Sequence, residues 1–158
     1  NHIVLSETPG PAFEMVVSLT RQKVPGLVIS STFPTKIMRQ FNLPEDTVIY
    51  WLTYTASSHN TLDPKRLEFE CTRALSNFVK NNKGPVILLD GVEYLVIENS
   101  FEKILKFIKK VNDIASVNEA TFIVAVNSGS LPLDQLTTLK KEFDKVIVVE
   151  DYLPPPES

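Results

Sequence analysis

The stretch that decides the fold runs from Pro85 to Leu95 and reads PVILLDGVEYL. Its apolar residues lead directly into Asp90 and Gly91. A continuous apolar run that ends at turn residues is typical of a strand buried on both faces of a parallel sheet. A carboxylate at the end of such a strand lies at the sheet edge where open α/β folds bind their ligands. Asp90 is therefore the first candidate for a functional residue.

Strand-like segments recur along the chain on both sides of this stretch. They are short, apolar and partly β-branched, and they cover residues 3–5, 27–30, 48–52, 122–126 and 146–149. Segments with apolar residues at helical spacing lie between most of them. Strands that alternate with helices in this way predict a three-layer α/β/α fold with right-handed crossovers and a mainly parallel sheet of about five to six strands.

Several residues predict where the helices begin. Pro34 suits the first position of a helix, where its missing N–H costs nothing. Asp63 followed by Pro64 predicts an N-cap and a first helical residue. Asn99 with Glu102 three positions later resembles a capping box. We therefore expect helices that begin at each of these three places.

Composition is that of a globular protein without a basic character. The 158 residues carry a formal net charge of −3, so nucleic acid is not an expected partner. Four lysines of the helix that follows Asn99 are spaced to lie on its solvent side rather than to form a phosphate-binding patch; they are Lys103, Lys106, Lys109 and Lys110. No apolar run reaches the ~18 residues of a membrane span, so direct membrane insertion by this segment is not expected.

The chain is expected to form one domain over residues 1–152. Residues 153–158 read LPPPES, a composition typical of a tail or linker, which predicts that the domain belongs to a larger protein. The single cysteine, Cys71, has apolar neighbours at helical spacing and is expected in the core. One thiol forms no internal disulfide, and we expect a cytoplasmic location.

The PVILLDG strand looks like a Walker B strand, which holds Mg²⁺ in P-loop ATPases. The phosphate loop itself requires G-x-x-x-x-G-K-[ST], and none of the five glycines precedes Lys-Ser or Lys-Thr. The nearest candidate runs over residues 26–37, where Lys36 could stand in for the Walker lysine. Ile37 then occupies the place of the Mg²⁺-binding hydroxyl, and Pro34 removes one N–H donor. ATP hydrolysis by the usual P-loop mechanism is therefore not expected.

Asp90 and Glu93 each have two interpretations, one structural and one chemical. Asp90 either binds a metal–phosphate ligand or accepts hydrogen bonds from the turn that follows it. Glu93 is either the second carboxylate of an acid/base pair or an acid at a helix start that faces solvent. A receiver-type phosphorylation site is incomplete, because Ser6-Glu7 and Asn127-Ser128 stand where an acidic pair and a lysine would be needed.

Other kinds of site find little support. The histidines, His2 and His59, and Cys71 form no group with metal-ligand spacing, so we expect no metal and no cofactor. Ser128 and Ser130 flank a glycine without the G-x-S-x-G pattern of a nucleophile elbow. The aromatic side chain of Trp51 is expected in the core rather than as a stacking platform.

Several stretches together resemble an archaeal family of domains of unknown function, DUF835. They are PGLVISSTFPTKI, VIYWLT, LDPKRL, VILLDGVEYLVIENSFEKILKFI and FIVAVNSGSL, and the resemblance covers about residues 3–143. Ser31 stands where the family usually has an arginine. The resemblance implies a fold similar to inactivated RecA/KaiC-like ATPase domains and a regulatory role in archaeal signalling proteins, without naming a catalytic residue.

Two functions follow as hypotheses. The first is a non-catalytic module that binds protein partners or a second copy of itself. The second is a sensor that binds a nucleotide or another small ligand at the carboxyl ends of the strands without hydrolysis. An enzyme with an unfamiliar site is a third class. The residues expected to line the ligand site are Ser31, Thr32, Lys36, Thr53, Asp90, Glu93 and Asn127.

Overall fold

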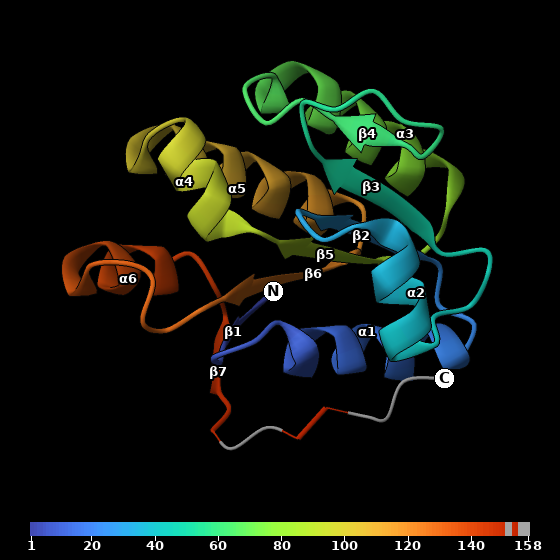
Figure 1. The fold of residues 1–158 in the computed structure, drawn as a ribbon, viewed down its shortest axis with the longest axis horizontal. Coiled ribbons are helices and arrows are strands. Elements are labelled where there is room, and N and C mark those ends of the chain that lie inside the picture. Colours follow the sequence, from blue (N-terminus) through green and yellow to red (C-terminus); the bar gives the residue numbers. More distant parts are fainter. Residues whose placement is uncertain (151–152, 155–158) are drawn as a thin grey trace.

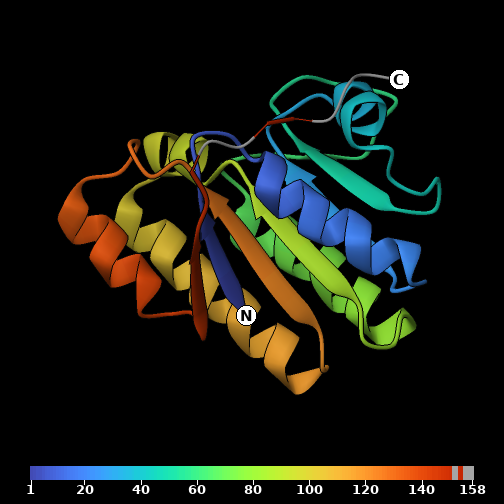
Figure 2. The same cartoon turned by 90° about the horizontal axis from the view of Figure 1, so that it is seen from below.

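Seven parallel strands form the central layer of the protein (Figure 1). The computed structural model describes residues 1–150 and 153–154. The strand order across the sheet is β4-β3-β2-β5-β6-β1-β7. The strands are β1 (His2–Leu5), β2 (Gly26–Ser30), β3 (Val48–Leu52), β4 (Thr61–Leu62), β5 (Val86–Asp90), β6 (Thr121–Val126) and β7 (Lys145–Val148). Seen from below in Figure 2, β1, β6 and β5 run side by side in one direction.

Helices cover both faces of this sheet, so the three-layer α/β/α prediction is confirmed. One face carries α1 (Gly10–Arg21) and α2 (Pro34–Phe41). The other face carries α3 (Thr72–Asn81), α4 (Val92–Glu98), α5 (Phe101–Val117) and α6 (Leu133–Lys140). A short π-helical turn, η1 (Leu67–Cys71), leads into α3.

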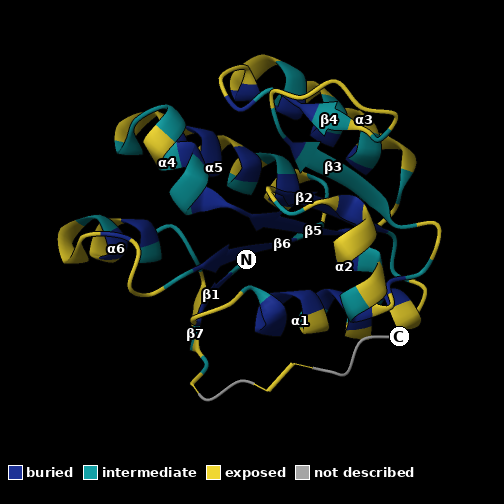
Figure 3. Ribbon diagram, viewed as in Figure 1, coloured by how far each residue is buried: buried dark blue, intermediate teal, exposed yellow. Residues whose placement is uncertain are grey.

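The VILLD stretch, Val86–Asp90, forms strand β5 at the centre of the sheet, and all five of its residues are buried (Figure 3). Successive side chains of a strand point to opposite faces. Ile87 and Leu89 accordingly enter the core under α3, α4 and α5, whereas Val86 and Leu88 enter the core under α1 and α2. The sequence-based prediction of a strand buried on both faces is confirmed.

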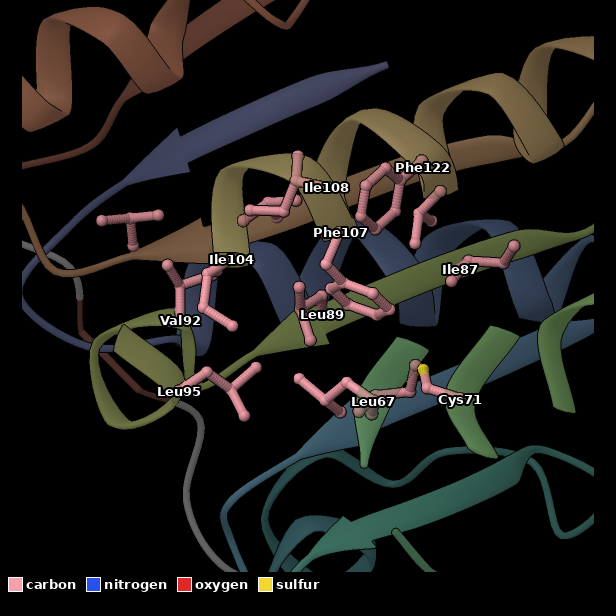
Figure 4. Packing of buried hydrophobic residues seen from close by; sticks show 14 of the residues in the cluster. Leu67, Cys71, Ile87, Leu89, Val92, Leu95, Ile104, Phe107, Ile108 and Phe122 are labelled. Carbon is pink, nitrogen blue, oxygen red and sulfur yellow. The ribbon is translucent and has the colours of Figure 1, made fainter. Parts of the chain in front are cut away.

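Large side chains fill each core. On one side Phe107 of α5 lies among Leu89, Leu95 and Leu67, and its side chain is fully buried (Figure 4). Cys71 belongs to the same core, as predicted, and burial raises the pKa of its thiol to about 12. Burial of a large apolar side chain such as that of Phe107 stabilises the fold by about 1.5–3 kcal/mol.

The sheet has one strand more than the sequence predicts. β4 contains only Thr61 and Leu62 and follows a polar loop, so the sequence has no apolar run that would predict it. It is held by backbone hydrogen bonds to β3, from Trp51 N to Asn60 O (2.8 Å) and from Thr53 N to Leu62 O (3.2 Å). Trp51 itself is half-buried, and its ring lies edge-on to that of Phe33.

Two predicted helix starts are wrong. Asp63 does not cap a helix; its carboxylate accepts a hydrogen bond from Lys65 N (2.9 Å) in a turn, and the helical chain begins later, at Leu67. Asn99 does not cap α5 either, because the Ser100 side chain accepts the bond from Lys103 N (3.2 Å). The side-chain amide of Asn99 closes α4 instead, donating to Leu95 O (3.0 Å).

Two other predictions concern exposed parts of the chain. The four lysines of α5 are exposed, as predicted for its solvent side. The predicted tail at 153–158 lies for the most part outside the described residues. In the described part of the chain, every helix is too short or too polar to cross a membrane.

Candidate functional site

The loops at the carboxyl ends of the central strands leave the sheet in opposite directions. The chain turns from β1 and β2 to the helices of one face, and from β5 and β6 to the helices of the other. Neighbouring strands whose loops diverge open a crevice, which is where α/β sheets bind ligands. A cavity of about 330 Å³ lies there. We call it the carboxyl-end cavity; its lining residues are Glu7, Thr8, Pro9, Ser31, Thr32, Asp90, Gly91, Glu93, Tyr94, Ala125, Val126, Asn127 and Ser130.

Asp90 lies at the bottom of this cavity with only 8% of its surface exposed. Its Oδ2 accepts a hydrogen bond from the hydroxyl of Ser30 on the adjacent strand β2, at 2.7 Å. The Ser30 oxygen in turn accepts a bond from Thr32 N at 3.0 Å. The hydrogen-bond partner of the Asp90 side chain is thus Ser30 on the neighbouring strand. The structural interpretation of the sequence expected partners in the turn that follows Asp90.

The environment of Asp90 makes its ionised form costly. Burial raises the pKa of this carboxyl to about 6, and the nearby charge of Glu93 acts in the same direction. The Ser30 hydrogen bond opposes both, because it stabilises the carboxylate. Shifted pKa values of carboxyls in a cleft are common at functional sites, so the environment of Asp90 makes this residue a candidate for function.

Gly91 allows the chain to leave β5 directly above the cavity floor. Its φ of +118° lies in a region that residues with a Cβ rarely adopt. A Cβ at this position would also lie 3.1 Å from Ser31 Oγ. The positive φ favours glycine here and the close contact adds to this preference, which explains why Asp-Gly follows the apolar run.

Glu93 ties two loops together. It is half-buried on the first turn of α4, and its Oε1 accepts a hydrogen bond from Asn127 N at the end of β6 (2.5 Å). Glu93 is thus an acid at a helix start, as one of its two interpretations predicted, but it is half-buried and hydrogen-bonded and does not simply face solvent. Asn127 also donates from Nδ2 to Glu7 O (3.2 Å) and accepts from Gly129 N (2.9 Å), so it connects the loops that follow β1 and β6.

The seven residues expected at the site fall into two groups. Ser31, Thr32, Asp90, Glu93 and Asn127 line the carboxyl-end cavity.

Lys36 and Thr53 do not line it. Lys36 is exposed on α2 and borders a smaller cavity, together with Phe13 and Phe41. Thr53 Oγ1 accepts a hydrogen bond from Thr55 N (3.0 Å) beyond the end of β3. The expected lysine is therefore not among the residues that face Asp90 across the carboxyl-end cavity.

A family model described as "Protein of unknown function (DUF835)" matches residues 6–143. The chain belongs to the DUF835 family. All the loops that line the carboxyl-end cavity fall within the matched residues. No curated protein matches the sequence.

The loop after β1 contributes residues to the DUF835 cavity that the sequence interpretation missed. Glu7, Thr8 and Pro9 line it, and Gly10 begins α1. This strand–loop–helix unit reads LSETPGPA, so Pro11 and Ala12 follow Gly10 where G-x-x-x-x-G-K-[ST] has its lysine and hydroxyl. The spacing of Gly10 after a short apolar strand is the pattern in the sequence that points to this loop.

The cavity of the DUF835 domain is acidic. Three carboxylates line it, those of Glu7, Asp90 and Glu93, and its lining includes no lysine, arginine or histidine within the described ranges 1–150 and 153–154. Like charges repel most strongly where water is excluded. A triphosphate would therefore meet repulsion here instead of the cation and N–H donors that a phosphate loop supplies.

Proposed function

We propose that this DUF835 domain is a non-catalytic interaction or regulatory module, of the kind formed by inactivated RecA/KaiC-like ATPase domains in archaeal signalling or cellular organisation. A cytoplasmic location fits this role. Support for the non-catalytic part comes from the loop after β1, in which Pro11 offers no N–H and Ala12 no hydroxyl. The observation that carries the interaction part is the open outer edge of β7.

Strand β7 is the last strand of the sheet and pairs only with β1 in the described part of the chain. The N–H groups of Lys145 and Val149 bond to β1, at Asn1 O (3.3 Å) and Leu5 O (2.9 Å). Since residues alternate along a strand, the backbone groups of Val146 and Val148 point outward. Their side chains are 44% and 61% exposed. An exposed apolar edge of this kind is a template for pairing with another strand.

The residues of β7 fit a second copy of the same strand. Two copies can pair antiparallel about Val148, which sets Ile147 opposite Val149 and Val148 opposite itself. The neighbouring register, centred on Ile147, sets Asp144 opposite Glu150, two acids that repel each other. A two-fold axis through Val148 would join two sheets into one, the commonest symmetry of homo-oligomers.

Analytical ultracentrifugation over a range of protein concentrations tests this proposal. The wild-type chain is expected to dimerise, and Val148→Lys is expected to be monomeric because the two-fold axis would bring two lysines together. Val117→Lys is the matched control, since Val117 is 82% exposed at the end of α5 and outside the proposed interface. A wild-type chain that stays monomeric, captures no partner and turns over a nucleotide would contradict the proposal.

A sensor is the second candidate function, and the carboxyl-end cavity favours it. Its volume of about 330 Å³ falls within the range of small-molecule pockets. The acidity of its lining disfavours the nucleotides among the expected ligands. Calorimetry with ATP and AMP tests that part, with heat of binding expected for neither.

A further inference from the structure

One oxygen of the Asp90 carboxylate faces the carboxyl-end cavity without a donor from the part of the chain that the structure describes. Asp90 is 8% exposed, and its Oδ2 accepts the Ser30 hydroxyl. Its Oδ1 accepts no hydrogen bond from any described residue, and Asp90 lines the cavity. A buried charge is costly unless it is paired and hydrogen-bonded. Oδ1 is therefore open to the cavity, where its donor is either water or the N–H of a ligand.

The other two carboxylates come from separate loops around the same space. Glu7 follows β1 and is exposed, whereas Glu93 lies on α4 with Oε1 held by Asn127 N. Glu93 Oε2 has no hydrogen-bond donor in the part of the chain that the structure describes. No lysine, arginine or histidine among the described residues lines the cavity, so a ligand with N–H donors would supply the counter-charge to these carboxylates.

The neutral groups of the lining suit the same kind of ligand. Ser31, Thr32 and Ser130 are among the lining residues, and a hydroxyl accepts a hydrogen bond from a donor. The three carboxylates are spread around the cavity, and no three acidic, histidine or cysteine side chains in the described residues gather closely enough to hold a metal ion.

From these observations we propose that the carboxyl-end cavity binds a small organic cation with an ammonium or guanidinium group, whose N–H donors bridge Asp90 and Glu93. This inference rests on the second candidate function, ligand sensing, and gives its ligand a charge and a donor pattern. The cation supplies the hydrogen bond that Asp90 Oδ1 lacks. Charge-assisted bonds of this type are about twice as strong as neutral ones.

Thermal-shift measurements and calorimetry with three cations test the inference: putrescine, agmatine and arginine. A ligand that binds only the folded chain raises its stability, so at least one of the three is expected to raise the melting temperature. Butane-1,4-diol is the matched neutral compound for putrescine and is expected to give no shift. ATP and Mg²⁺ are tested by the same two measurements.

Variants locate the binding site. Asp90→Asn and Glu93→Gln keep the size and the acceptor oxygen of each side chain and remove its charge. Each is expected to weaken binding of the cation by about tenfold or more. Glu45→Gln is the matched control, because Glu45 borders a different cavity, beside Thr47 and Ile49. Its affinity is expected to equal that of the wild-type chain.

Three results would overturn the inference. Equal binding of the diol and putrescine would show that charge does not select the ligand. Binding of ATP or Mg²⁺ without any response to the amines would assign the cavity to another ligand class and leave sensing intact. Absence of binding by every compound would remove the sensing hypothesis too, whereas the β7 interface would still stand or fall with the Val148→Lys experiment.

Discussion

The hydroxyl of Ser30 donates a hydrogen bond to Asp90 Oδ2 across 2.7 Å and so joins the carboxyl ends of β2 and β5. Ser30 is completely buried, and its oxygen also accepts a bond from Thr32 N. The carboxylate, the hydroxyl and the loop after β2 therefore form one connected unit beneath the cavity. Substitution of Asp90 is expected to raise stability and weaken ligand binding, whereas substitution of Ser30 is expected to lower stability.

Asp90→Asn is expected to stabilise the folded chain at pH 7.5. The pKa of Asp90 rises from 3.8 to about 6 on folding, so its native carboxyl holds a proton more tightly than the unfolded one does. The cost of its charge is fully present above about pH 6 and is lost as the pH falls toward 4. The upper bound of this cost is about 3 kcal/mol. Urea denaturation of both proteins at pH 7.5 measures the difference.

The same variant gives a pH profile that a packing effect would not produce. The difference in unfolding free energy between Asp90→Asn and wild type is expected to shrink between pH 6 and pH 4, because the protonated aspartate and the asparagine are then both neutral. A difference that stays constant over this interval would show that Asp90 does not titrate as its burial indicates.

Ser30→Ala is expected to destabilise the chain by about 1–3 kcal/mol at pH 7.5, because a buried carboxylate loses its hydrogen-bond donor. When Asp90 is already replaced by asparagine, Ser30→Ala should cost about 1 kcal/mol less, because the carboxylate that needs the hydroxyl is gone. This difference is the coupling energy of the double-mutant cycle. Thr138→Ala is the matched control: its hydroxyl bonds to Asp134 O (3.0 Å) on an exposed helix face. An additive double variant would contradict the connection between Ser30 and Asp90.

Two glycines with positive φ offer a direct comparison. Gly91 has φ +118°, and a Cβ there would lie 3.1 Å from Ser31 Oγ, whereas Gly84 has φ +60° and nothing within 4 Å. Gly84→Ala therefore bears only the conformational cost, about 1–2 kcal/mol. Gly91→Ala adds a close contact with Ser31 and is expected to cost about 1–3 kcal/mol more. Chemical denaturation of both variants checks the order, and equal losses would contradict the close approach at Gly91.

The sequence was sufficient to predict β5 and the position of Asp90, because a continuous apolar run that ends at Asp-Gly is typical of a buried parallel strand followed by a turn. It was insufficient where hydrogen bonds decide between neighbouring residues. Asn99 and Ser100 are both good caps, and only the direction in which the chain leaves α4 selects Ser100. β4 depends on two backbone bonds that no apolar pattern records.

The candidate site was predictable only in part for a similar reason. Asp90, Glu93 and Asn127 follow or end apolar strands, and the carboxyl ends of parallel strands meet at one edge. Which loops face one another depends on the strand order. No single segment of the sequence indicates that β5 and β6 lie between β1 and β2. That order turns the loop containing Glu7 toward Asp90 and leaves Thr53 outside the cavity.

Glu93→Ala is expected to free the amide of Asn127, since Glu93 Oε1 is its acceptor. Hydrogen exchange at the Asn127 amide, followed by NMR, should accelerate by about tenfold, which corresponds to the loss of about 1.4 kcal/mol. Glu93→Gln retains an acceptor oxygen and should keep the amide protected. Glu102→Ala, at an exposed position of α5, is the control and should leave this amide unchanged.

The pair of Glu93 variants separates two roles of one side chain. If Glu93→Gln protects the Asn127 amide and still weakens amine binding, the acceptor oxygen holds the loops together and the charge serves the ligand. A Glu93→Gln protein that binds amines as the wild type does would show that Glu93 is only a tie between α4 and β6. Rapid exchange in both variants would instead mean that the loop after β6 needs the charge itself, because a neutral acceptor forms a weaker bond with the same N–H.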